Sequence, residues 1–316
     1  MFLDNFISVI IPVYNGEKDL RPMADCLIRQ DYPFERFECL FIDNKSTDKS
    51  REVLSEICAK MVYEGVSSAC LFEENIQSAA AARNRGIRAS KGDILVFVDV
   101  DCRPEPGWLR HLMEPFESPN VLIVAGMIVP LPGKSFIERY TLYKGILLQE
   151  GTLTHASYKL PYAQTANLAI RRFVLQKVGL FRPYVTSGED ADLCWRIINE
   201  FKCGIFYQKT ATVKHKARSD LKGLIRQARS YGLGEAYLER IYGTLPGGTS
   251  SGIYCIRHFL SWMLKKAPIQ LLKMCIGKGN MASLMRDPLD IIFAYERIKA
   301  RRDAVLMDGF EIIPEL

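Results

Sequence analysis

Short apolar runs and helical patterns alternate along the first hundred residues. The apolar runs are rich in valine, isoleucine and phenylalanine, which is typical of strands that are buried on both faces. They lie at residues 6–12, 37–42, 69–72 and 94–98. Segments with the apolar spacing of a helix lie between them, at residues 17–30, 49–60 and 79–87. This order predicts an α/β fold with a mostly parallel, wound sheet and flanking helices.

The pattern becomes less regular after residue 101. Helices are expected at residues 108–116, 136–148 and 173–178, and strands at 121–126, 166–171, 204–207 and 211–213. Three carboxylates, Glu189, Asp190 and Asp192, then cluster where a further helix begins. The helix macrodipole favours negative charge at that end.

The apolar run at 94–98 leads directly into Asp99 and Asp101. A buried strand does not tolerate unpaired carboxylates, so we expect the strand to end near Asp99. Ligands bind at the carboxyl ends of strands in open α/β sheets. In an extended chain both aspartates would point the same way, with Val100 turned to the core, which suits Mg²⁺ or Mn²⁺. Two solvated aspartates at a strand-to-turn junction are the alternative, and these three residues alone do not decide between them.

Composition and charge narrow the class of protein only moderately. The 316 residues are 48% hydrophobic and 25% charged, which is ordinary for a soluble globular chain. A net charge of +6 suits a phosphate-bearing ligand or an anionic membrane surface. The nine cysteines have no paired framework, which indicates free thiols in a reducing, cytoplasmic compartment. We expect no signal peptide, no membrane-spanning helix and no nucleic-acid partner.

Several segments, taken in order, resemble the catalytic domain of glycosyltransferase family 2, a nucleotide-sugar-dependent fold called GT-A. The resemblance covers roughly residues 6–220. The segments that carry it are Val9-Ile-Ile-Pro-Val-Tyr-Asn15, Ile42-Asp-Asn-Lys-Ser-Thr-Asp48, Arg83-Asn-Arg-Gly86, Asp99-Val-Asp101 and Glu189-Asp-Ala-Asp-Leu193, with His215 downstream. Each segment alone is weak evidence for the resemblance, whereas the whole set in this order is strong evidence.

The resemblance implies a site for a nucleotide-sugar donor and a divalent metal, Mn²⁺ or Mg²⁺. Asp101, His215 and Asp99 are the expected metal ligands. Asp43 is expected to accept a hydrogen bond from a base N–H, and Arg83 to reach the diphosphate. A turn or capping aspartate and a solvated helical arginine remain the alternatives for these two residues. The other expected donor-binding residues are Pro12, Val13, Tyr14, Asn15, Asn44 and Val100.

The acceptor hydroxyl must lose a proton as it attacks the anomeric carbon, and a carboxylate can take it. The resemblance assigns this catalytic role to Asp190 with Glu189 beside it, and places Asn167 and Asp192 on the acceptor side. Glu189 and Asp192 could instead cap the helix. The implied reaction is inverting transfer from a nucleotide-diphosphate sugar, with a UDP-sugar favoured, to a saccharide or lipid-linked acceptor in surface polysaccharide or glycolipid assembly.

Some residues depart from the family pattern. Processive synthases carry a Gln-x-x-Arg-Trp segment, of which Gln227-Ala-Arg-Ser-Tyr231 is a loose echo, so transfer of one sugar is favoured. Lys45, inside the segment from Ile42 to Asp48, also departs from the family pattern, so the identity of the donor's nucleotide base stays open. A sugar-phosphate nucleotidyltransferase is an alternative, but residues 12–16 lack its Gly-rich loop. A non-catalytic binding module is another, and the complete set of Asp99, Asp101 and Asp190 argues against it.

We divide the chain into a catalytic domain at residues 1–220 and a helical region at 221–316. In the first, residues 1–101 form the nucleotide-sugar half and 102–220 the acceptor half. Residues 251–280 contain five basic residues and no acid between large apolar ones, which indicates peripheral contact with the inner face of the cell membrane. A packed appendage or a dimer contact is the alternative. The helix expected at 290–305 looks merely solvated.

Overall fold

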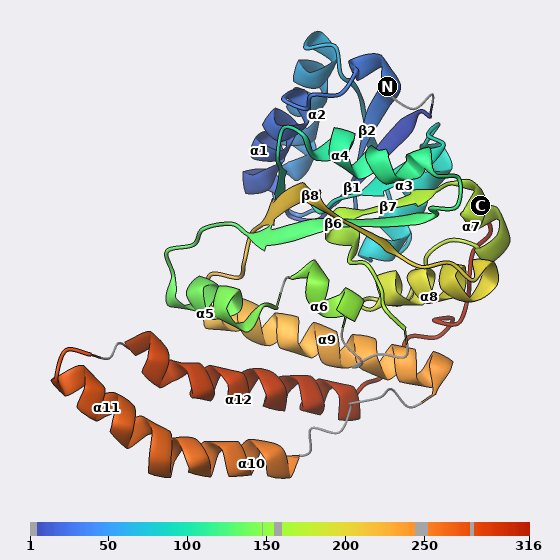
Figure 1. Cartoon of the computed structure of the whole chain (residues 1–316). Coiled ribbons are helices and arrows are strands. Elements are labelled where there is room, and N and C mark those ends of the chain that lie inside the picture. The colour runs from blue at the N-terminus through green and yellow to red at the C-terminus, as the bar shows by residue number, and fades with distance from the viewer. Residues whose placement is uncertain (1–4, 147, 155–159, 244–251, 279–280) are drawn as a thin grey trace.

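The computed structural model describes residues 5–146, 148–154, 160–243, 252–278 and 281–316. Its centre is a mixed sheet, with two layers of helix around it and a helical region below (Figure 1). The strands are β1 (Ile7–Val13), β2 (Phe37–Asp43), β3 (Ser67–Phe72), β4 (Ile94–Phe97), β5 (Cys102–Pro104), β6 (Ile123–Pro130), β7 (Leu168–Arg171) and β8 (Phe206–His215). Their order in the sheet is β3-β2-β1-β4-β7-β6-β8-β5.

The predicted parallel arrangement holds for the first half of the chain. Strand β1 pairs in parallel with both β2 and β4, and β2 pairs in parallel with β3. In the second half, β7 is antiparallel to β4 and β6, and β5 is antiparallel to β8. Strands β6 and β8 are again parallel, so four of the seven pairs between the described strands are parallel. The sheet is mostly parallel, as predicted, and its three antiparallel pairs lie in the second half. Strand β8 is one continuous element where the sequence predicts two pieces.

Helices cover both faces of the sheet. They are α1 (Glu17–Ile28), α2 (Ser50–Tyr63), α3 (Ala79–Ala89), α4 (Trp108–Met113), α5 (Phe136–Lys144), α6 (Gln149–Thr154), α7 (Phe173–Val178) and α8 (Glu189–Phe201). One apolar cluster joins α1, α2 and α4 to the sheet, and a second joins α3, α7 and α8 to its other face. Successive residues of β1 serve the two clusters in turn, since Val9 and Ile11 lie in the first and Ile10 in the second.

The helical region consists of α9 (Leu221–Tyr242), α10 (Gly252–Ser261), a π-helical turn at Trp262–Lys266, α11 (Ala267–Cys275) and α12 (Met281–Arg302). Leu289 and Phe293 of α12 are buried in one cluster with Leu224 and Ala228 of α9. The ion pair between Arg229 and Glu296 fastens the same two helices at 2.7 Å.

These contacts correct the expectation of a merely solvated terminal helix. Glu296, Arg297 and Arg301 of α12 pair with charges on α9, while Leu289 and Phe293 face the protein. Among the described residues, no helix combines the length and hydropathy that crossing a membrane requires.

Gly232 sets the distance between α9 and α12. A Cβ atom at this position would lie 2.1 Å from the backbone oxygen of Arg297 and 3.0 Å from the backbone nitrogen of Arg301. Backbone atoms in the middle of a helix cannot shift to relieve a steric clash, whereas the end of a flexible side chain can. The two helices can therefore lie this close only because residue 232 is glycine.

We predict that Gly232→Ala lowers the melting temperature. Overpacking costs about 1–3 kcal/mol, and the higher helix propensity of alanine returns only up to about 1 kcal/mol. Gly151→Ala is the matched control, because it lies in helix α6 and a Cβ there meets nothing within 4 Å. Calorimetry of both variants provides the measurement. A melting temperature of Gly232→Ala at or above that of the wild type would contradict the close packing.

Candidate active site

A cleft of ≈ 940 Å³ opens at the carboxyl ends of β1 and β4. The sheet and helix α3 form one wall, and α9 and α12 form the opposite wall. Among the residues proposed for the site from the sequence, those that line it are Pro12, Val13, Tyr14, Asn44, Arg83, Asp99, Val100, Asp101, Glu189, Asp190 and His215. The cleft therefore brings together residues, far apart along the chain, that the sequence predicts to bind the donor, hold the metal and catalyse the transfer.

The two aspartates after β4 lie in a turn, not in an extended strand. Strand β4 ends at Phe97, and the Cys102 amide donates to the Asp99 carbonyl oxygen at 3.0 Å. The expectation of extended chain through Asp101 is therefore wrong. The turn leads into β5, whose pairing with β8 sets Cys102 opposite His215. This register brings the His215 ring beside both aspartates: its Nε2 lies 3.5 Å from Asp101 Oδ1 and 3.9 Å from Asp99 Oδ2.

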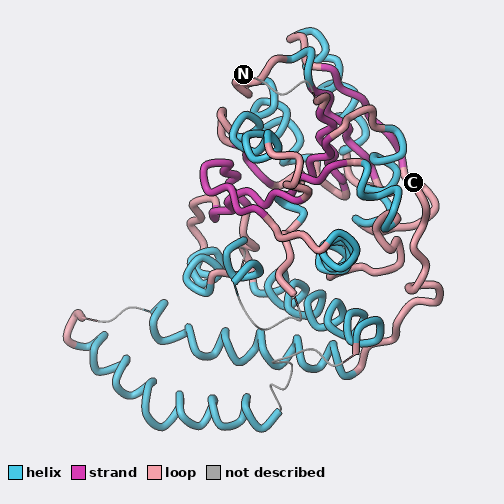
Figure 2. Tube along the Cα trace, turned by 45° about the vertical axis from the view of Figure 1, so that its right-hand side comes forward, coloured by secondary structure: helices cyan, strands magenta, loops and turns pink. Residues whose placement is uncertain are grey.

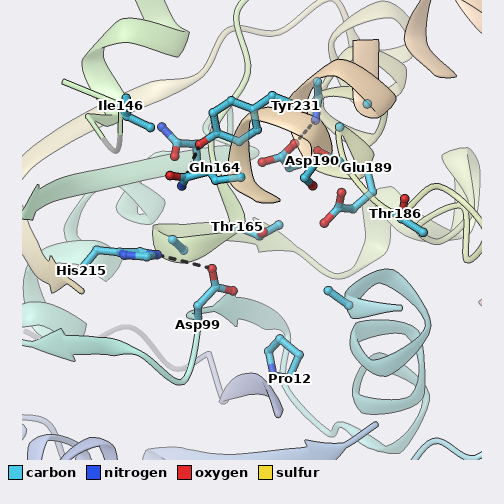
Figure 3. Close-up of a pocket in the computed structure, with 18 of the residues that line it drawn as sticks. Pro12, Asp99, Ile146, Gln164, Thr165, Thr186, Glu189, Asp190, His215 and Tyr231 are labelled. Atoms are coloured by element: carbon cyan, nitrogen blue, oxygen red, sulfur yellow. Dashed lines mark hydrogen bonds and ion pairs between the residues drawn. The ribbon is translucent and has the colours of Figure 1, made fainter. Parts of the chain in front are cut away.

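These three side chains fit a divalent metal ion. His215 Nδ1 lies 3.0 Å from the Lys216 carbonyl oxygen, which can only accept, so Nδ1 carries the proton of the neutral ring. The lone pair of Nε2 then faces the carboxylates (Figure 3). Both separations from His215 are longer than ordinary hydrogen bonds. Asp101 and His215 lie close enough together to ligate one ion, and Asp99 Oδ2 lies 3.9 Å from the same ring nitrogen.

Cys102 lies close to this group, within 4.8 Å of the ligand atoms of Asp101 and His215. Its thiol is fully buried and points to the Ala166 carbonyl oxygen at 3.7 Å. Burial raises the pKa of the thiol well above its usual value, which disfavours the thiolate that binds metals. The donor set is therefore two carboxylates and one imidazole, which suits Mn²⁺ or Mg²⁺.

Arg83 occupies the centre of the charged wall. Its guanidinium is buried and donates to Asp99 Oδ1 at 2.9 Å and to Glu189 Oε1 at 2.8 Å. The neighbouring residue Asn84 binds the backbone N–H and C=O of Phe181, at 3.0 and 2.8 Å. Helix α3 is thereby joined to the segment before α8. Arg83 is thus a buried partner of two acids, and the alternative of a solvated helical arginine is wrong.

The paired acids at the start of α8 have different surroundings. Glu189 is held by Arg83, whereas Asp190 is half-buried and accepts only from the Ala191 amide, at 2.8 Å, among the contacts of the described residues. Burial, with the Glu189 carboxylate beside it, raises the pKa of Asp190 to about 7. Figure 3 shows Asp190 and Glu189 across the cleft from Asp99 and His215. Asp190 is therefore the carboxylate that is free to exchange a proton near neutral pH.

Two of the expected donor-side residues, Asn15 and Asn44, make hydrogen bonds within the protein. Asn15 accepts from the Thr47 amide at 2.8 Å, and the Asn44 amide group donates to backbone oxygens of Glu73 and Ile76. Both residues hold loops together, and Asn15 does not line the cleft.

Asp43 is fully buried behind the cleft wall. Its Oδ1 accepts from Arg51 Nε at 2.9 Å, and its Oδ2 has no hydrogen-bond partner. A buried carboxylate oxygen without a partner is costly, which makes Oδ2 a candidate acceptor, but Asp43 itself is not among the residues that line the cleft.

The acceptor-side expectation is wrong for Asn167. This side chain is fully buried, accepts from Trp108 Nε1 at 2.8 Å, and donates to the Met127 and Ala211 carbonyl oxygens at 2.9 Å. It joins helix α4 to strands β6 and β8, and lies outside the cleft lining. Both amide hydrogens and the amide oxygen of Asn167 are therefore engaged within the fold.

Asp192 also lies outside the cleft. It has no exposed surface and accepts from Arg182 Nε at 2.9 Å, Arg196 Nη2 at 2.8 Å and the Tyr242 hydroxyl at 2.7 Å. Arg182 also donates to the Glu311 carbonyl oxygen of the chain after α12. Asp192 therefore anchors α8 to α9 and to the C-terminal segment, and is not an acceptor ligand.

Sequence reasoning missed the wall formed by α9 and α12. This wall is lined by Gln227, Ser230, Tyr231, Gly234, Glu235, Leu238, Phe293 and Arg297. Gln227 Oε1 is buried without a partner, so it can accept from a ligand hydroxyl. The echo of a family motif at Gln227–Tyr231 was the available signal.

Comparison with known proteins identifies the class. The profile of Glycosyl transferase family 2 matches residues 8–179, more than half of the chain. The chain belongs to glycosyltransferase family 2, and it is a glycosyltransferase with a GT-A fold. This family membership favours a transferase over the nucleotidyltransferase and the non-catalytic module that the sequence left open.

Two relatives and one solved structure illustrate the similarity. Glycosyltransferase AglE of Haloferax volcanii is 33% identical over 58% of this chain and 59% of its own length. A Methanococcus voltae protein, a dolichyl N-acetyl-alpha-D-glucosaminyl phosphate 3-beta-D-2,3-diacetamido-2,3-dideoxy-beta-D-glucuronosyltransferase, is 26% identical over 75% of this chain and 74% of its own. The chain thus spans about three fifths of the first relative.

The similar structure is a mannosyltransferase, PcManGT, from Pyrobaculum calidifontis in complex with GDP-Man and Mn²⁺. It superposes with a TM-score of 0.58 over 97% of this chain and 78% of its own, at 16% identity. At that identity the likeness concerns the fold alone.

We predict that Asp192→Ala destabilises the protein by about 3–5 kcal/mol, because it leaves Arg182 and Arg196 without their buried partner. Thermal or urea unfolding measures this loss. Glu200→Ala on the same helix is the control, since Glu200 is exposed and 3.9 Å from its lysine partner. If the variant keeps its stability and shows a raised KM for the acceptor, Asp192 binds the acceptor and does not anchor the fold.

Proposed function

We propose that the protein is an inverting, metal-dependent glycosyltransferase. It transfers one sugar from a nucleotide-diphosphate donor, with a UDP-sugar favoured, to a hydroxyl of a saccharide or lipid-linked acceptor. The supporting observation is the pair of opposed groups across the cleft: the Asp190 carboxyl, with a pKa raised to about 7, faces the Asp99–His215 pair. We assign the reaction to surface polysaccharide or glycolipid assembly, in the cytoplasm at the inner face of the cell membrane.

In this proposal Asp190 is the general base. Its carboxylate takes the proton of the acceptor hydroxyl while that oxygen attacks the anomeric carbon. The bond from the anomeric carbon to the diphosphate oxygen breaks, and the nucleoside diphosphate leaves with the electron pair. Attack opposite the leaving group inverts the anomeric configuration. Glu189 is less suited to the role because its ion pair with Arg83 occupies Oε1.

Asp101, His215 and Asp99 would hold the divalent ion on the donor side. When bound, such an ion supplies Lewis-acid neutralisation of the departing diphosphate. Arg218, with Nη1 3.8 Å from Asp101 Oδ2, adds positive charge beside them and lines the cleft. Pro12, Val13 and Tyr14 would border the base, and Asp43 Oδ2 would accept a base N–H.

The acceptor would bind against α9 and α12. Tyr231, Leu238 and Phe293 make much of this wall apolar, and Gln227 Oε1 offers a buried acceptor for one hydroxyl. A wall of this mixed character suits an acceptor with both a sugar and an apolar part. The dolichyl-linked substrate in the name of the Methanococcus relative is consistent with that class. A thermal-shift panel of nucleotide sugars, with and without Mn²⁺, tests the donor side of the proposal.

We expect Asp101→Ala to abolish turnover and the Mn²⁺-dependent stabilisation by the donor, while the ligand-free protein melts near the wild-type temperature. The reason is that Asp101 lies in a turn at the cleft and not in the core. Glu105→Ala is the control, because that exposed acid pairs only with Lys214 on the surface among the described contacts. Near-wild-type turnover of Asp101→Ala would refute the metal assignment.

We expect Asp190→Asn to preserve donor affinity but to lower turnover by about 10²-fold or more, since it removes proton abstraction from the transition state. In the wild type, kcat/KM should fall as the pH drops below about 7, because the base becomes protonated there. The variant's residual rate should lack that dependence. Lost donor affinity with intact turnover would instead place Asp190 in the donor site.

A further inference from the structure

Helix α10 and the π-helical turn expose a continuous apolar stripe. Ile253, Ile256, Leu260 and Leu264 recur at intervals of three and four residues, and their side chains are 44% to 68% exposed. Residues at that spacing lie on one face of a helix. The stripe continues in α11 with Ile269, Leu272 and Ile276, which are 54% to 66% exposed. We call helix α10, the π-helical turn and helix α11 together the arm, and these seven residues its outer face.

The opposite side of the arm is fastened to α12. Cys255 is buried, Trp262 Nε1 donates to the Leu284 carbonyl oxygen at 3.0 Å, and Lys266 pairs with Asp287 at 2.7 Å. Both views show α10 and α11 beside α12, on the side away from the sheet (Figures 1 and 2). The arm therefore already has its intramolecular partner, and its outer face points away from the rest of the described chain.

Such a surface requires a partner outside the described chain. Monomeric soluble proteins rarely expose contiguous apolar patches of more than a few hundred Å². The partner must also match the charge of the arm. Residues 252–278 contain no acid, and the exposed basic residues on them for which no ion pair is recorded are Arg257, Lys265, Lys273 and Lys278. The sequence stretch that suggested membrane contact also includes residues 251, 279 and 280, which lie outside the described residues.

We propose that the outer face of the arm lies in the interface of an anionic lipid membrane. An in-plane helix needs an apolar face to insert and basic residues for the headgroups, and the arm has both. A symmetric contact with a second copy fits less well, because it would bring the two basic arms together with no acid on either. Lipid supplies the acyl chains and the negative charge at once.

Attachment through this face would also set the position of the cleft. Helices α9 and α12 lie between the arm and the catalytic sheet, and the same two helices form the proposed acceptor wall of the cleft. The membrane would then lie one layer of helix from the proposed acceptor wall. Membrane binding itself does not depend on the proposed reaction, so either can fail without the other.

Co-sedimentation of the full chain with vesicles tests the proposal. Phosphatidylcholine vesicles containing phosphatidylglycerol should bind it at about 0.1 M salt, and less at about 1 M, where the screening length falls from about 10 Å to about 3 Å. Vesicles of phosphatidylcholine alone should bind it weakly. Each basic residue near an anionic surface contributes about fivefold to partitioning, so Arg257→Glu, Lys265→Glu, Lys273→Glu should weaken binding by about 100-fold or more.

Two matched controls separate the face from general effects of charge and exposure. The variant Lys18→Glu, Lys49→Glu, Lys91→Glu makes the same charge change at exposed sites on the catalytic domain and should lose far less binding. Ile256→Ser, Leu264→Ser, Leu272→Ser should abolish insertion. Val62→Ser, Tyr63→Ser on α2 should not, although those side chains are 59% and 89% exposed.

Three results would overturn the proposal. The first is absence of binding to anionic vesicles at low salt, and the second is equal loss of binding in the two charge-reversal variants. The third is self-association of the wild type without lipid, measured by sedimentation, that the triple serine variant removes. The last result would assign the outer face to a second copy of the chain.

Discussion

The charge of Arg83 is the constraint on which the active site depends. A guanidinium can be buried only with partners that neutralise it, and the chain supplies Asp99 from the end of β4 and Glu189 from the start of α8. The two halves of the catalytic domain thus meet at one cation. Because Glu189 serves that cation, its neighbour Asp190 is left without a positive partner in contact. Burial is the largest cause of the raised pKa of Asp190, and the neighbouring Glu189 carboxylate raises it further.

Local pattern predicted much of this arrangement. Apolar runs ended at the observed strands β1, β2 and β4, and ordered polar segments identified eleven of the residues that line the cleft. The predicted acceptor-side roles of Asn167 and Asp192 are wrong because asparagine and aspartate are equally suited to binding a ligand and to accepting hydrogen bonds from buried donors. Only the tertiary positions of Trp108, Arg182 and Arg196 decide between these uses.

The same limit explains the error at α12. Alternating acids and bases are typical of a solvated helix, and they cannot reveal that α9 presents complementary charges beside them. Packing of α12 on α9 closes the cleft on the side opposite the sheet. The proposed acceptor wall is thus a product of the helical region, although every motif that identifies the family lies in the first 215 residues.

The close approach of α9 to the catalytic loop has a consequence for redesign. A Cβ on Gly234 would lie 2.8 Å from the Ser187 carbonyl oxygen, so backbone meets backbone just before Glu189 and Asp190. The floor of the cleft at this point is made by main chain, which substitution cannot reshape without moving the acid pair. An engineer who wishes to change the accepted sugar should leave that glycine intact. Tyr231, Leu238 and Phe293 are the positions to vary, because they line the same wall with side chains rather than with main chain.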